Sequence, residues 1–196
     1  MTTLNPCLPT LVLLSDWQDC ACDGWQCVWP LSHSDHARWV KVEQDDWQWP
    51  RRGDWMMQLD EALLAEPLLL ERPAVLVAQG LGCHLVAAWA AHSQHVARVA
   101  GAWLVAPPDL DAPERLAQLP PQLHGWVKVP RGPLPFPAQV LAPTDAPDSS
   151  LARARELAAD WQADFVAVDE PAAALRGPWP EGWARLQPWL ADRIQT

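Results

Sequence analysis

One short segment of the chain has the layout that places a nucleophile for covalent catalysis. Residues 74–78 are an apolar run typical of a buried strand, residues 79–82 form a glycine-containing turn, and a helical pattern follows directly. In an open α/β sheet this order presents the middle residue of a G-x-S-x-G motif above the carboxyl ends of the strands. The middle residue here is Gly80, which has no side chain to attack a substrate.

Side chains near this turn could replace the missing serine. Cys83 falls about one turn into the helix, where we expect a buried thiol of the core, since free cysteines are usually buried. His84 stands four residues after Gly80, and we expect it on the helix surface or in a cap rather than at a pocket mouth. Ser149 and Ser150 are further candidate nucleophiles.

A second group of residues could bind a metal. Cys20, Cys22 and Cys27 precede His33 and His36, and thiolate and imidazole are ligands that zinc accepts. The cysteine spacing differs from the usual C-x₂-C pair, so we expect ordinary reduced thiols, no bound metal and no cofactor. A structural zinc site at these five residues is the alternative.

The elements that must position these residues follow an alternating pattern. Six apolar segments predict strands at 8–14, 39–42, 74–78, 99–106, 139–142 and 165–168. Helical spacing predicts a short helix within 15–29 and longer ones at 55–70, 83–92, 151–161 and 183–194. Strands that are apolar throughout and alternate with helices indicate an α/β fold of three layers, with a mostly parallel sheet covered on both faces.

Composition limits the class of protein further. The 196 residues are 49% hydrophobic and 19% charged, which suits one domain with a proper core. A net charge of -10 argues against nucleic acid or an anionic membrane as a partner. No apolar run is long enough to cross a membrane, and the N-terminus is a poor signal peptide. We therefore expect a cytoplasmic protein whose five cysteines are reduced.

Several ordered motifs resemble those of one known family, the small serine hydrolases related to retinoblastoma-binding protein 9 and YdeN. The similar segments cover some 180 residues: Val77-Ala78-Gln79-Gly80-Leu81-Gly82-Cys83, Asp23-Gly24-Trp25-Gln26 with Trp29, Val42 to Trp47 with Pro50, Asp54-Trp55, Trp89, Leu104 to Asp109, Leu134 to Pro137, Thr144 to Pro147 and Trp179-Pro180-Glu181-Gly182. The resemblance implies a minimal α/β-hydrolase fold without a lid domain, over residues 4–194.

The resemblance also implies a Ser-His-Asp acyl hydrolase, and the chain departs from that pattern at several positions. Gly80 takes the place of the nucleophile, and the segment around Asp169 takes the place of the catalytic histidine, since no histidine follows His124. Asp16 lies in the loop that helps to form the oxyanion site, where its charge would repel a developing oxyanion. Asp145 alone retains its family role, that of the triad acid.

These departures favour a non-catalytic protein that binds or regulates. The expected pocket is lined by Asp16, Trp17, Gln79, Gly80, Leu81, Asp145 and Trp179. We expect Asp145 to cap the helix that starts near Ser149. The alternative is that its carboxylate binds a cationic ligand.

The pocket would engage a protein partner or a small acyl or peptide-like ligand, and a surface formed by Trp17, Trp49 and Trp126 is a further candidate. The main alternative is an active esterase or amidase with relocated residues, such as Cys83 or a serine of 149–150. A zinc-dependent protein is a third hypothesis.

Overall fold

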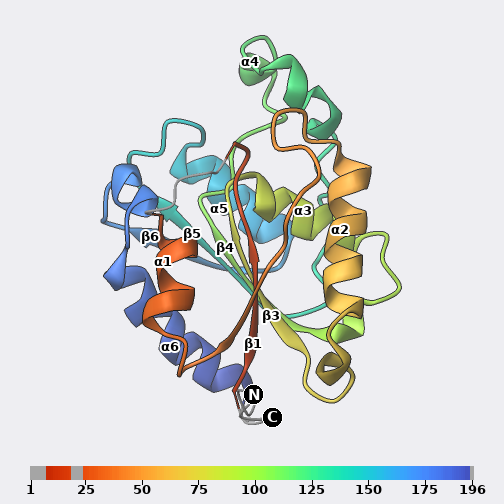
Figure 1. Cartoon of the computed structure of the whole chain (residues 1–196). Coiled ribbons are helices and arrows are strands. Elements are labelled where there is room, and N and C mark those ends of the chain that lie inside the picture. The colour runs from red at the N-terminus through yellow and green to blue at the C-terminus, as the bar shows by residue number, and fades with distance from the viewer. Residues whose placement is uncertain (1–7, 19–23, 195–196) are drawn as a thin grey trace.

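The computed structural model describes residues 8–18 and 24–194, which form one parallel sheet with helices on both faces. The strand order is β2-β1-β3-β4-β5-β6 and every neighbouring pair is parallel. The strands are β1 (Thr10–Leu14), β2 (Arg38–Lys41), β3 (Ala74–Gln79), β4 (Val99–Val105), β5 (Ala138–Pro143) and β6 (Asp164–Val168). All six strands that the sequence predicts are present, and the α/β architecture is confirmed (Figure 1).

Within residues 8–18 and 24–194, six α-helices accompany the sheet: α1 (Trp25–Ser32), α2 (Arg52–Leu64), α3 (Leu81–Ala90), α4 (Pro113–Leu116), α5 (Leu151–Asp160) and α6 (Pro180–Ile194). The helix expected over 55–70 is shorter than predicted, because Pro67 has no N–H to continue it and starts a separate 3₁₀ turn, Pro67–Leu70. In the described part of the chain, no helix is long and apolar enough to span a bilayer.

Alternating strand residues face two separate cores. Val12 and Leu76 pack toward α2, α3 and α5, whereas Leu11 and Val75 pack toward α1 and α6. The sheet is therefore the middle of three layers, as the sequence predicts. The second core is rich in indole rings, since Trp25, Trp29, Trp103, Trp179, Trp183 and Trp189 all belong to it.

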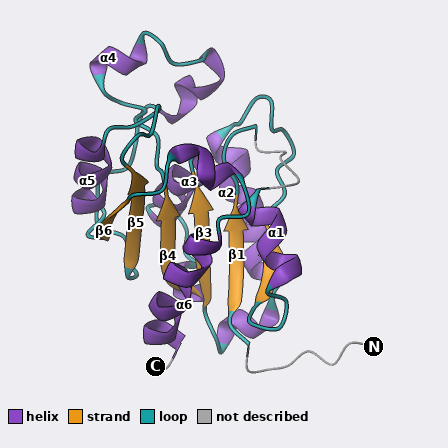
Figure 2. Cartoon of the chain, turned by 90° about the vertical axis from the view of Figure 1, so that its left-hand side faces the viewer, coloured by secondary structure: helices purple, strands orange, loops and turns teal. Residues whose placement is uncertain are grey.

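The carboxyl ends of the strands point to one edge of the molecule, where the connecting loops gather (Figure 2). The chain between β4 and β5 makes a long excursion beyond this edge and carries α4 and the 3₁₀ turn Pro121–Trp126. Several residues of this roof segment, residues 106–137, line the hollow described below.

Candidate functional site

The turn between β3 and α3 keeps a sharp bend although it has no serine. Gly80 has φ 54° and ψ -123°, a backbone conformation that glycine adopts without the steric cost other residues bear. Its N–H donates to the carbonyl of Val105 at 2.9 Å, and α3 starts at the next residue, Leu81. The helix begins two residues earlier than the sequence pattern predicted, so the turn is as tight as a nucleophile elbow.

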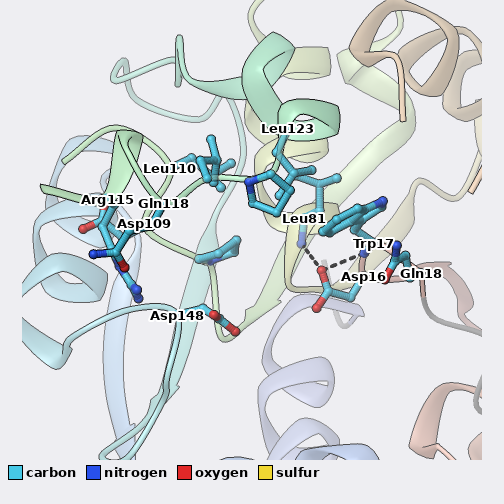
Figure 3. Close-up of a pocket in the computed structure, with 13 residues that line it drawn as sticks. Asp16, Trp17, Gln18, Leu81, Asp109, Leu110, Arg115, Gln118, Leu123 and Asp148 are labelled. Carbon is cyan, nitrogen blue, oxygen red and sulfur yellow. Dashed lines mark hydrogen bonds between the residues drawn. The ribbon is translucent and has the colours of Figure 1, made fainter. Parts of the chain in front are cut away.

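The carboxylate of Asp16 lies directly over this turn. Its Oδ1 accepts the N–H of Leu81 and the N–H of Trp17, each at 2.7 Å (Figure 3). In hydrolases of this architecture, the oxyanion hole consists of the N–H that follows the nucleophile and an N–H from a loop after another strand. An oxygen of the chain itself therefore occupies the position where an oxyanion would bind.

Asp16 and Gly80 depend on each other sterically. A Cβ built on Gly80 would approach the Asp16 carboxylate carbon and both its oxygens more closely than 3.0 Å, a separation that real Cβ atoms essentially never show. A serine at position 80 is therefore incompatible with this placement of Asp16. The absent side chain and the carboxylate over the turn are two parts of one arrangement.

A buried glutamine holds the loop that carries Asp16. Gln26, on α1, donates from Nε2 to the carbonyl of Leu14 at 3.0 Å and accepts the hydroxyl of Ser15 through Oε1 at 2.7 Å. Both Gln26 and Ser15 are buried. These bonds fix the chain at the end of β1, immediately before Asp16. The sequence analysis missed this role, although a glutamine between Trp25 and Trp29 on a buried helix face is a signal for it.

Two hollows adjoin the turn. The larger has a volume of about 370 Å³ and lies between the 16–18 loop, Leu81 and the roof segment (Figure 3). The smaller, of about 60 Å³, is lined by Gln79, Gly80 and Ser149 among others. Asp16 and Asp148 line both hollows.

The structure brings together most of the pocket residues expected from the sequence. Asp16, Trp17 and Leu81 line the larger hollow, and Asp16, Gln79 and Gly80 line the smaller one. Trp179 does not belong to either hollow, which corrects that expectation. Its ring is buried in the second core, 5.5 Å from the ring of Trp103, because it packs among the indole rings there.

Asp145 does not cap α5, contrary to expectation. The N-cap is Ser150, whose hydroxyl accepts the N–H of Arg153 at 3.2 Å. The Asp145 carboxylate instead accepts the N–H of Ala172 at 2.7 Å, and so ties the loop after β5 to the loop after β6. Asp169 is exposed at the end of β6. Asp145 is thus bound to the loop that follows Asp169, the position near which the resemblance places the catalytic histidine.

Neither Cys83 nor His84 lines a hollow. Cys83 is fully buried, as expected, and its thiol donates to the carbonyl of Val105 at 3.4 Å. Burial and the nearby charge of Asp16 raise the pKa of this thiol well above its usual value. His84 is buried rather than on the surface, which corrects the prediction, because its ring packs against the ring of Trp161 at the end of α5. Its Nε2 lies 2.7 Å from the carbonyl oxygen of Pro108, and burial lowers its pKa to about 4.

The proposed zinc ligands are not assembled among the described residues. Cys20 and Cys22 lie outside the described part of the chain. Cys27 is a free thiol, the ring of His33 stacks on Trp183 at 4.1 Å, and His36 contacts Asp35 at 2.7 Å. Residues 8–18 and 24–194 contain no group of three side chains placed to hold a metal ion.

The candidate tryptophan surface is also corrected. Trp126 is buried, because its Nε1 donates to the carbonyl of Pro50 at 2.8 Å and its ring packs against Trp55. Trp17 is partly buried at the larger hollow, and Trp49 is 51% exposed. These three residues do not form one exposed surface.

The parallel sheet, the sharp turn after β3 and the loops at the carboxyl edge define an α/β-hydrolase fold. The chain belongs to the serine hydrolase family, whose model matches residues 11–188. A comparison with curated proteins gave no significant match.

Solved structures support the fold. A proposed YdeN-like hydrolase from Pectobacterium atrosepticum is 24% identical, with a TM-score of 0.75 over 95% of this chain and 93% of that one. The ydeN gene product from B. subtilis is 15% identical, with a TM-score of 0.70 over 93% and 99% of the two chains. A thermophilic esterase from Thermogutta terrifontis is 16% identical, with a TM-score of 0.68 over 95% and 90%.

Proposed function

We propose that this chain is a non-catalytic member of the serine hydrolase family, which binds a small ligand or a protein partner at the carboxyl edge of its sheet. One observation carries the proposal: the Asp16 carboxylate accepts the two N–H groups of an oxyanion hole, directly above a residue without a side chain. A carboxylate at this position disfavours the negative charge that develops on an ester or amide oxygen during acyl transfer.

The missing catalytic groups support the same proposal. In a serine hydrolase, removing the nucleophile or the histidine alone costs about 10⁶ in turnover, and the residual rate comes largely from the oxyanion hole. This chain has glycine at the nucleophile position and an exposed aspartate near the histidine position. None of its six histidines lines either hollow beside the turn. The described residues that line these hollows therefore include no histidine to act as a base, Gly80 supplies no nucleophile at the turn, and the Asp16 carboxylate occupies the two N–H donors above it.

Binding does not require those groups. Two hollows remain beside the turn, and the sheet edge that carries them is built from well-packed strands and helices. Concave sites at the carboxyl ends of parallel strands are where α/β folds generally bind ligands. The site is thus shaped to bind a ligand, although the turn beside it has glycine where a serine hydrolase has its nucleophile.

One observation favours the alternative, an active hydrolase with relocated residues. Ser149 lines the smaller hollow together with Gly80. Its Oγ lies 3.4 Å from the carbonyl oxygen of Ser150, however, and no histidine lines that hollow to activate it. A working serine at this position would need a base supplied by a different side chain.

The decisive experiment is covalent labelling of the native protein with a serine-directed fluorophosphonate, together with turnover of p-nitrophenyl acetate. We expect no stoichiometric adduct and no turnover above the heat-denatured protein. A stoichiometric adduct would overturn the proposal. Loss of that adduct in Ser149→Ala, but not in Ser93→Ala, would assign the activity to the relocated serine, since Ser93 lies away from both hollows at the end of α3.

A further inference from the structure

The turn that joins α1 to β2, residues 33–36, brings two imidazole rings together outside both hollows. We propose that His33 and His36 bind one divalent transition-metal ion of the class that accepts nitrogen ligands, such as Ni²⁺, Cu²⁺ or Zn²⁺. Two protein ligands are fewer than a structural metal centre has, so water completes the coordination. This inference is independent of the proposed function.

Backbone hydrogen bonds fix the turn that carries the two rings. α1 ends at Ser32, and the carbonyl of His33 accepts the N–H of His36 at 3.1 Å. The same carbonyl accepts the indole N–H of Trp39, on β2, at 3.1 Å. The turn is thereby closed on itself and tied to the edge strand, and the centres of the two imidazole rings lie 5.9 Å apart.

Stacking holds the ring of His33. This ring lies flat on the indole of Trp183, on α6, with the ring centres 4.1 Å apart and an angle of 7° between the planes. In the described part of the chain, no group hydrogen-bonds to its ring nitrogens. Stacking uses the face of the ring, so the edge that carries both nitrogens stays available to an ion.

Asp35 orients the ring of His36. Nδ1 of His36 lies 2.7 Å from Oδ1 of Asp35. An ionised carboxylate only accepts hydrogen bonds, so Nδ1 carries the proton of the neutral ring and Nε2 keeps its lone pair. Metal-bound histidines usually donate their second ring N–H to a carboxylate or a carbonyl in the same way. The His36 side chain is 48% exposed, so an ion can reach it from solvent.

The distances among the three rings show where His36 lies. Its ring centre is 5.9 Å from that of His33 and 5.8 Å from that of Trp183, and its plane is nearly perpendicular to both. A ring over the free face of His33 would lie much farther from Trp183, so His36 lies beside the stacked pair. With metal–nitrogen bonds of about 2.1 Å, two imidazoles on one ion have ring centres about 5–6 Å apart. The observed separation therefore fits an ion shared at the edge of His33.

Charge and ligand chemistry decide which ion fits. The chain carries a net charge of -10, which attracts cations in general. Imidazole suits Ni²⁺, Cu²⁺ and Zn²⁺, and the affinity of such a site is highest for Cu²⁺. Mg²⁺ and Ca²⁺ prefer oxygen ligands, and a single carboxylate beside the turn is a poor site for either of them. We therefore expect discrimination between these two classes of divalent ion.

The test is a titration of the full-length protein with NiCl₂. Ni²⁺ does not oxidise free thiols as Cu²⁺ does, and this chain has five cysteines. Calorimetry gives the affinity and the stoichiometry. In proton NMR spectra, paramagnetic Ni²⁺ below one equivalent broadens the ring signals of the histidines that it binds. We expect one saturable site, selective broadening of two of the six histidines, and no binding of Mg²⁺ at the same concentration.

Variants assign the ion to the turn. His33→Gln and His36→Gln should each weaken Ni²⁺ binding about tenfold or more, because a single imidazole remains. Asp35→Asn should weaken it about tenfold while the same two rings still broaden, because this change removes an orienting group and not a ligand. The matched control is the double variant His92→Gln and His95→Gln, which removes the other pair of histidines three residues apart and should bind like the wild type.

Three results would overturn the inference. The first is the absence of saturable Ni²⁺ binding. The second is an affinity that stays unchanged in both His33→Gln and His36→Gln, or broadening confined to other histidines. The third is binding that survives these substitutions and disappears when the thiols are alkylated, which would assign the ion to cysteines. None of these results depends on whether the protein forms a fluorophosphonate adduct.

Discussion

Two features disfavour any side chain at position 80: the positive φ of Gly80 and the neighbouring carboxylate of Asp16. We expect Gly80→Ala to destabilise the protein by about 1–2 kcal/mol for the left-handed backbone alone, and by more because its Cβ overlaps the Asp16 carboxylate. In an Asp16→Gly background the overlap is gone, so the same change should cost less. A double-mutant cycle from urea unfolding measures this coupling.

Gly53→Ala is the matched control for that cycle. Gly53 lies in α2 and a Cβ there meets nothing within 4 Å, so the change should stabilise by up to about 1 kcal/mol in either background. If Gly80→Ala costs the same with and without Asp16, the carboxylate does not lie over the turn.

His84 makes stability depend on pH. Burial lowers its folded pKa to about 4, against an ordinary 6.5, so between these values the unfolded chain binds a proton that the folded chain does not. The free energy of unfolding should therefore fall by about 3 kcal/mol as the pH falls from 6.5 to 4, with no contribution from His84 above 6.5.

Urea unfolding at several pH values checks this prediction. His84→Gln should lose the pH dependence in that window, because glutamine does not titrate. His124→Gln, at an exposed position, should keep it. An unchanged pH profile in His84→Gln would show that other groups control acid stability.

At the residue scale, the sequence shows which side chains stand at the positions of the resemblance, but not which hydrogen bonds they make. The absence of a nucleophile at position 80 and of a histidine after His124 is visible in the sequence. The hydrogen bonds of Asp16 are not visible in the sequence, because they depend on the conformation of residues 15–18. That conformation depends in turn on the hydrogen bond from Gln26 to Leu14. Loop conformations of this kind follow from tertiary contacts rather than from local pattern.

At the level of elements, an ion-pair network fixes the roof segment. Arg131 pairs with Asp111 and with Asp160 at the end of α5, and Arg153 of α5 also pairs with Asp111. The roof segment that lines the larger hollow is thereby tied to α5 at both of its ends.

Arg131→Gln should loosen the roof segment. Partly exposed pairs contribute little individually, so we expect a loss of about 1 kcal/mol in global stability but a clear rise in amide hydrogen exchange over α4 and the following 3₁₀ turn. Arg185→Gln breaks an ion pair with Glu170 at the other side of the sheet and serves as the control. Unchanged exchange over α4 would contradict this role of the network.

Helices and strands could be predicted from the sequence wherever burial determines the spacing of the apolar residues. The strands are apolar because both faces of the sheet are covered, and this signal places all six of them. The roof segment gave no such signal: it is rich in proline and its short helices depend on contacts with distant residues, such as Trp126 with Pro50. Its part in the larger hollow therefore emerged only from the structure.

For the molecule as a whole, the second core depends on closely packed indole rings. Trp103 on β4 contacts the rings of Trp25, Trp29 and Trp179 and donates from Nε1 to Gln139 at 3.1 Å. Trp103→Ala should cost about 3–5 kcal/mol, which lowers the Tm by roughly 6 to 20 °C in a domain of this size. Calorimetry checks this, and Trp49→Ala, at a half-exposed position, should shift the Tm far less.

The mutual exclusion of a side chain at position 80 and the carboxylate of residue 16 means that these two positions cannot be altered independently. A serine placed at position 80 by itself meets the Asp16 carboxylate. Replacement of Asp16 by itself frees the N–H groups of Trp17 and Leu81 but adds no nucleophile to the turn. A serine can therefore be accommodated at this turn only if residue 16 changes or moves at the same time.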